Sequence, residues 1–242
     1  MLKDIQEKIL YSDEITNLIQ SKDIECVFFG GSSLEQLESP ESDYNIILIS
    51  SGNFNPTLNK RYFYLNHASL NINKPVQITL YFLESLFEVL NNPYSLFEYS
   101  HYEILKSLLL LSKEHLLYCS PKFLTFLIKL QNYREALITL ATEGSLHSVK
   151  DALSKTLPIE YNKNIYYFYK AYYYWLNFKK SNRLFLTETQ SKDLKLLKNS
   201  KTIPASFQKD LRQLYPYFFK AKRYDYNKLR KELVLIWGKR FL

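Results

Sequence analysis

Two apolar runs joined by a glycine-serine turn and a polar loop give this sequence its organising pattern: Phe28-Phe29-Gly30-Gly31-Ser32-Ser33, and later Asp43-Tyr44-Asn45-Ile46-Ile47-Leu48-Ile49. The pattern predicts a buried strand, a turn that opens a short helix, and a second strand. Side chains at i and i+2 of a strand share a face, so Asp43 and Asn45 can both face one site. The turn can offer backbone N–H groups and a hydroxyl to a phosphate. A carboxylate facing such a turn indicates metal-assisted phosphoryl transfer.

The residues from Gly31 to Asn45 resemble a family signature. They read Gly31-Ser32-x-Leu34-x-x-Leu37-x-Ser39-Pro40-Glu41-Ser42-Asp43-x-Asn45. This is similar, without a gap, to Gly-Ser-x-Leu-Tyr-Gly-x-x-Thr-Pro-Glu-Ser-Asp-x-Asp in the predicted nucleotidyltransferases of the DNA polymerase β superfamily, the YcgL-like group. Residues 78–98 resemble the group's third-strand segment and the helix after it, and 203–231 resemble its closing helices more loosely. The resemblance implies a small mixed-sheet nucleotidyltransferase core.

The resemblance also implies which residues would form the site. Three carboxylates hold two divalent ions in this superfamily, and their positions fall here on Asp43, Asn45 and Gln77. Two ions about 3.5–4 Å apart need anionic ligands, and amides replace two of the three. We therefore expect a degenerate carboxylate set, with Mg²⁺ bound weakly or not at all. The nucleotide phosphates of an NTP would contact a second group of residues, namely Gly30, Gly31, Ser32 and Ser33.

Basic residues are concentrated in the second half of the chain. Residues 1–150 carry 12 Lys/Arg and 17 Asp/Glu, a net charge of −5, whereas residues 151–242 carry 20 and 7, a net charge of +13. This asymmetry predicts contact with a polyanion, either RNA or nucleotide phosphates. Lysines that simply keep a tyrosine-rich domain soluble are the alternative explanation.

An aromatic tract lies in this basic half, from Tyr166 to Trp175. Its rings could stack nucleic-acid bases while neighbouring lysines meet phosphates, with Lys170 as the expected phosphate contact. So many consecutive aromatics on one helix cannot all face one groove, which favours packing for most of them.

Apolar periodicity predicts an α/β fold class, with a nucleotidyltransferase-like domain over 1–115 and a helical, basic, tyrosine-rich domain over 116–242. Strands are expected at 24–29, 44–50, 62–65 and 76–81. Helices are expected at 2–20, 82–90, 96–111, 122–142, 145–153, 163–178, 189–198, 206–219 and 225–237.

Two cysteines and the lack of a long apolar run suggest where the protein works. Cys26 lies in a predicted strand and Cys119 is distant in the sequence, so we expect a buried free thiol in a reducing compartment. No N-terminal signal and no membrane-length apolar segment are visible, which predicts a cytoplasmic protein without a membrane partner.

Three functions fit this sequence. In the first, a degenerate nucleotidyltransferase fold binds RNA, a nucleotide or a protein partner as a regulatory module. In the second, an active enzyme moves a nucleoside monophosphate from an NTP to a hydroxyl of RNA or protein, with Asp43 holding Mg²⁺ while Asn45 and Gln77 complete its ligand shell. In the third, the tyrosine-rich helices form an interface and the cleft is empty. The sequence leaves all three open.

Overall fold

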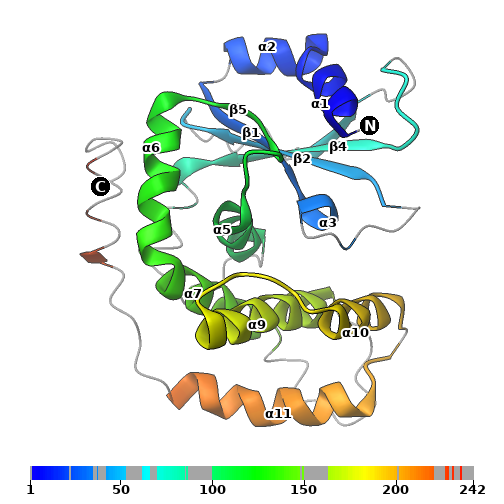
Figure 1. The fold of residues 1–242 in the computed structure, drawn as a ribbon, viewed down its shortest axis with the longest axis vertical. Helices are drawn as coiled ribbons and strands as arrows, with labels where there is room; N and C mark the ends of the chain where they lie inside the picture. The colour runs from blue at the N-terminus through cyan, green and yellow to red at the C-terminus, as the bar shows by residue number, and fades with distance from the viewer. Residues whose placement is uncertain are drawn as a thin grey trace. The chain divides into compact units, whose positions relative to one another are not determined.

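A computed structural model gives the fold of this protein and describes part of its chain. The described residues are 2–21, 23–34, 37, 42–52, 62–65, 70–84, 86, 100–147, 149, 163–200, 202–220, 227–228, 231 and 235. They form a mixed α/β fold in which the strands lie in the first half and helices dominate the second (Figure 1). The predicted α/β class is confirmed.

Helices and strands alternate at first and then give way to consecutive helices. In chain order they are α1 (Leu2–Leu10), α2 (Asp13–Ser21), β1 (Ile24–Gly30), α3 (Gly31–Leu34), β2 (Tyr44–Ser50), β3 (Tyr62–Leu65), β4 (Val76–Phe82), α5 (Ser100–Leu110), β5 (Leu116–Cys119), α6 (Pro121–Leu130), η1 (Gln131–Tyr133), α7 (Arg134–His147), α9 (Lys163–Ser181), α10 (Glu188–Asn199) and α11 (Ala205–Lys220).

Within the described residues, five strands form one mixed sheet in the order β3-β4-β2-β1-β5. Strand β1 is antiparallel to both β2 and β5, β2 is parallel to β4, and β3 is antiparallel to β4. Alternate residues of the central strands point to one face and are fully buried, including Val27, Phe29, Ile46 and Ile78. They join one apolar cluster with Ile5, Ile9 and Ile15 of α1 and α2, so these two helices complete the core on that face.

The predicted strands at 24–29, 44–50, 62–65 and 76–81 are confirmed within one residue at each end. The single helix expected over 2–20 is wrong, because the chain turns at Tyr11 and Ser12 and forms two helices. The Ser12 hydroxyl donates to the Ile9 carbonyl at 2.8 Å and accepts from the Ile15 N–H at 3.4 Å. A serine side chain that serves both helix ends in this way favours a break.

Strand β5 was not expected, and it changes the division of the chain. It pairs with β1, so the sheet continues past the predicted boundary between 115 and 116. Two compact units are present, one comprising 1–88, 110–131 and 231–242, the other 89–109 and 132–230. In the described parts of the chain, no helix combines the length and apolar character needed to cross a membrane.

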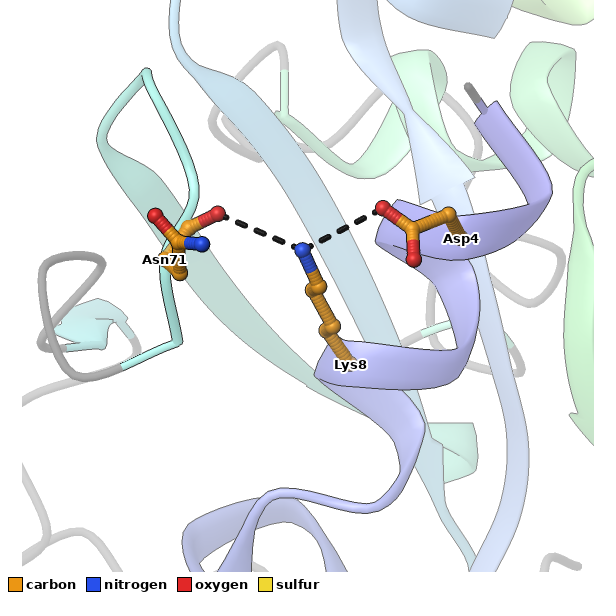
Figure 2. A network of polar contacts seen from close by, with 3 residues as sticks. All are labelled: Asp4, Lys8 and Asn71. Atoms are coloured by element: carbon orange, nitrogen blue, oxygen red, sulfur yellow. Dashed lines mark hydrogen bonds and ion pairs between the residues drawn. The ribbon is translucent and has the colours of Figure 1, made fainter.

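A polar contact joins helix α1 to the turn that leads into β4 (Figure 2). The Lys8 ammonium lies 3.2 Å from a carboxylate oxygen of Asp4 and donates to the backbone carbonyl of Asn71 at 3.4 Å. Asn71 has a φ of 51°, in the left-handed region that asparagine tolerates better than most residues. The contact holds α1 against the start of the strand that carries Gln77.

Replacing Phe29 with alanine tests the core beneath the sheet. The ring is fully buried and meets Tyr44 edge-on at 6.0 Å between centroids. We expect Phe29→Ala to lower the free energy of unfolding by about 3–5 kcal/mol, measured by urea denaturation. Tyr11→Ala is the control, because that ring is 76% exposed and its removal should cost less than about 0.5 kcal/mol. Equal losses would contradict this placement of the core.

Candidate functional site

A row of residues crosses four strands of the sheet on the face opposite the α1–α2 core. Gly30 pairs with Asn45, Asn45 lies beside Gln77, and Gln77 pairs with Tyr64. Partners in register point to the same face, so the side chains of Asn45, Gln77 and Tyr64 lie side by side. We call Gly30, Asn45, Gln77 and Tyr64, together with Asp43, the polar row.

Asp43 and Asn45 are in direct contact at one end of β2. The Asn45 amide nitrogen donates to a carboxylate oxygen of Asp43 at 3.2 Å, and both side chains are half-buried. Because the nitrogen faces Asp43, the amide oxygen is the remaining acceptor of Asn45. The Asn45 amide thus gives the Asp43 carboxylate a neutral hydrogen-bond donor. The family that residues 31–45 resemble has a second carboxylate at this position.

The double glycine lies against Asn45 and must be glycine on steric grounds. Gly31 has a φ of +62°, which a residue with a side chain adopts only with strain. A Cβ there would also lie 3.0 Å from the Asn45 amide nitrogen, and one on Gly30 would overlap Ile47 Cδ1. The backbone of the turn therefore sits directly beside the polar row. The side chains of Ser32 and Ser33 lie outside the described residues, so their phosphate contacts stay predictions.

Gln77 has a partner that sequence patterns did not indicate. Its amide nitrogen donates to the Tyr64 hydroxyl at 3.3 Å, and the Tyr64 side chain is 62% exposed. The contact depends on the register between β3 and β4, which no local pattern in either strand specifies. Gln77 is itself half-buried.

Negative charge is scarce in the polar row, where Asp43 supplies the one carboxylate. Across the described residues, no three or more His, Cys, Asp and Glu side chains gather closely enough to hold a metal ion. Of two acidic residues that could substitute for the missing carboxylates, Glu84 is exposed beyond the end of β4 and Glu41 lies outside the described residues. The donors among the described residues do not fit a two-ion site, which needs several anionic ligands.

Lys170 belongs to the interior of the second compact unit. It is 3% exposed, and its ammonium lies 5.3 and 5.0 Å from the ring centroids of Tyr166 and Tyr167. Such distances are typical of cation–π contacts. The phosphate contact proposed for Lys170 stays a prediction.

Most of the aromatic tract on α9 packs inside the second unit. Its buried members are Tyr166, Phe168, Tyr169 and Tyr174. The Tyr169 hydroxyl donates to the Phe207 carbonyl, which ties α9 to α11. Burial raises the pKa of Tyr169 above its ordinary value, and burial also raises the pKa of Tyr173, with Asp193 contributing. Packing therefore accounts for much of the tract, while Tyr172 and Trp175 stay half-buried and stacked on each other.

Comparison with known proteins does not assign the chain to a family. No protein-family model matches the sequence, and no curated protein matches it. The likeness to nucleotidyltransferases thus rests on residues 31–45 and on the weaker segments after them.

Gly31→Ala tests the close approach of the turn to Asn45. We expect it to lower the free energy of unfolding by about 1–2 kcal/mol from the left-handed φ alone, and further because Asn45 must move. The measurement is urea denaturation. In an Asn45→Ala background the same change should cost less, because the amide that a Cβ would meet is gone. If the losses in unfolding free energy from Gly31→Ala and Asn45→Ala were strictly additive, the nearby Asn45 side chain would not be what excludes a side chain at Gly31.

Proposed function

We propose that this protein is a nucleotide-binding module of nucleotidyltransferase type whose catalytic carboxylates have been largely replaced. The ligand is the triphosphate of a nucleotide, bound on the polar row beside the Gly30–Gly31 turn. One observation carries the proposal: the sheet brings Asp43, Asn45 and Gln77 together, although Gln77 lies far along the chain.

The pairing of β2 with β4 supports the proposal independently of the sequence signature. Residues 31–45 indicate the first two positions, whereas Gln77 rests on a much weaker likeness. The parallel register sets Asn45 directly beside Gln77. Neighbouring strands are about 4.8 Å apart, so one phosphate group could contact both amides. A chance likeness would not be expected to bring the aligned positions side by side.

The shortage of negative charge in the polar row is the reason that we propose nucleotide binding without efficient nucleotidyl transfer. Two magnesium ions carry four positive charges, and the polar row offers a single carboxylate against them. An amide NH2 group, in contrast, carries two N–H donors. Asn45 and Gln77 each use one, toward Asp43 and Tyr64, and keep the second for a phosphate oxygen without any metal. Asn45 and Gln77 thus suit a phosphate ligand better than they suit a metal pair. Asp43 would hold a single Mg²⁺ that accompanies the triphosphate.

Exposed basic residues of the second unit support RNA as a further partner. Lys180 lies in the last turn of α9, Arg183 lies just beyond that helix, and Lys195 and Lys198 lie on α10. All four side chains are exposed. Lysine and arginine on a surface attract phosphate backbones over a range set by salt. This surface would bind RNA without sequence preference.

Restoring the missing carboxylates tests the proposed site. In Asn45→Asp/Gln77→Asp, a carboxylate replaces the amide that donates to Asp43, so the metal-free variant should melt below the parent. Mg²⁺ with ATP should then raise the melting temperature of the variant more than that of the parent, because the ions neutralise the repulsion. Transfer of label from α-labelled NTP is expected in the variant and not in the parent.

Thr79→Asp is the matched control, because Thr79 lies two residues along the same face of β4 and pairs with Ile47. It adds a carboxylate away from Asp43 and should gain no response to Mg²⁺. An unchanged melting temperature with magnesium nucleotide in both the parent and the double variant would overturn the proposal. Label transfer by the parent, abolished in Asp43→Ala, would favour the active-enzyme alternative.

Charge reversal tests the RNA surface. Lys180→Glu/Lys195→Glu should weaken binding of single-stranded RNA and flatten its salt dependence by about 0.7 in log–log slope for each phosphate that is no longer neutralised. Fluorescence anisotropy between about 50 and 200 mM salt, the range over which such binding weakens by orders of magnitude, measures both effects. Lys113→Glu/Lys122→Glu changes the net charge equally through two exposed lysines of the first unit. Equal weakening in the two variants would show that net charge alone is responsible.

A further inference from the structure

The two cysteines of this chain are direct neighbours across the sheet. Cys26 of β1 pairs with Cys119 of β5 in antiparallel register. The adjacent pair is hydrogen-bonded, since the Ser120 N–H donates to the Glu25 carbonyl at 2.8 Å. Cys26 and Cys119 therefore form a non-hydrogen-bonded pair, the type in which Cα atoms are about 4.5 Å apart and side chains are closest. That separation lies inside the range that a disulfide spans, about 4.4–6.8 Å.

The two thiols differ in exposure and acidity. Cys26 is fully buried, whereas Cys119 is half-buried on the edge strand β5. A hydrogen bond from the Cys26 thiol to the Cys119 sulfur lowers the pKa of Cys119, although burial and the nearby Glu25 carboxylate oppose the shift. Burial chiefly, and the same hydrogen bond, raise the pKa of Cys26. Cys119 is thus the more accessible thiol and the better nucleophile.

We propose that Cys26 and Cys119 form a reversible, peroxide-sensitive thiol pair, in which Cys119 is oxidised first and Cys26 resolves it to an intramolecular disulfide. Both thiols are free in the structure. The proposal rests on the β1–β5 register and does not depend on nucleotide binding.

The reaction consumes one peroxide and removes two electrons from the sulfurs. The Cys119 thiolate attacks a peroxide oxygen, the O–O bond breaks, and the released hydroxide leaves as water after protonation. The resulting sulfenic acid is attacked by the Cys26 sulfur, the S–O bond breaks, and a second water departs with the Cys26 proton. A dithiol reductant reverses the cross-link by exchange.

The disulfide would fasten the edge of the sheet. Strand β5 has β1 as its neighbour in the sheet, and Ser120 directly after it caps α6 by accepting from the Phe123 N–H at 3.1 Å. A covalent link at Cys119 would therefore hold both β5 and the start of α6 against β1. Because it closes a long loop of the chain, it should raise the melting temperature by roughly 5–15 °C.

The test treats the reduced full-length protein with a small excess of hydrogen peroxide, blocks remaining thiols after denaturation, and measures intact mass. We expect the intact mass to fall by two hydrogen atoms, both thiols to resist alkylation, and digestion to yield a linked Cys26–Cys119 peptide. Dithiothreitol should restore both free thiols. With two cysteines in the chain, this product is distinguished from a disulfide-linked dimer on a non-reducing gel.

Single variants separate the two roles. Cys26→Ala should leave a sulfenic acid on Cys119 that dimedone traps, whereas Cys119→Ser should give neither adduct nor cross-link. The parent measurement decides the matter even if a variant does not fold. Intermolecular dimers alone, over-oxidation of Cys119 without a cross-link, or unreactive thiols in the folded parent would each overturn the proposal.

Discussion

The register of β2 between its two neighbours is the constraint on which the rest of this structure depends. Strand β2 is antiparallel to β1 and parallel to β4, so a single alignment sets Gly30, Asn45 and Gln77 in line. A slip of one residue would turn Asn45 into the apolar cluster beside α1 and α2, and would turn Ile46 out of it. Burying that amide while exposing that isoleucine costs several kcal/mol, so the core itself fixes where the polar row lies.

The same constraint explains the glycines. Strand β1 ends beside Asn45, and Gly31 turns the chain there with a left-handed φ. The absence of a side chain at Gly31 leaves room for the Asn45 amide, which a Cβ would approach to 3.0 Å. Gly30 leaves room for Ile47, a buried residue on the same face as Asn45. Each glycine is thus required by the side chain it faces on β2. The turn is consequently positioned by packed strands, which gives a ligand site a rigid base.

Strands whose residues follow a local apolar pattern could be predicted from the sequence. Strands β1 and β2 were predicted from near-continuous apolar runs, and β4 from its alternation, which burial follows residue by residue from Val76 to Phe82. Strand β5 was missed because its four residues, Leu116-Leu117-Tyr118-Cys119, are all apolar and show no alternation. Tyr64 beside Gln77, and Cys26 beside Cys119, were missed for a different reason. Both contacts are set by the register between strands, which sequence spacing does not encode.

Substituting amides for carboxylates also changes what the fold needs. Three clustered carboxylates repel one another unless cations are bound, so such a site stores strain in its metal-free form. In this chain the Asn45 amide donates to Asp43 and the Gln77 amide donates to Tyr64, so two of the three positions form favourable contacts without any ion. The proposed loss of catalysis and the stability of the metal-free site therefore have one physical origin. Under the proposed function, such a site would not need a metal pair and would bind an anion through its amides.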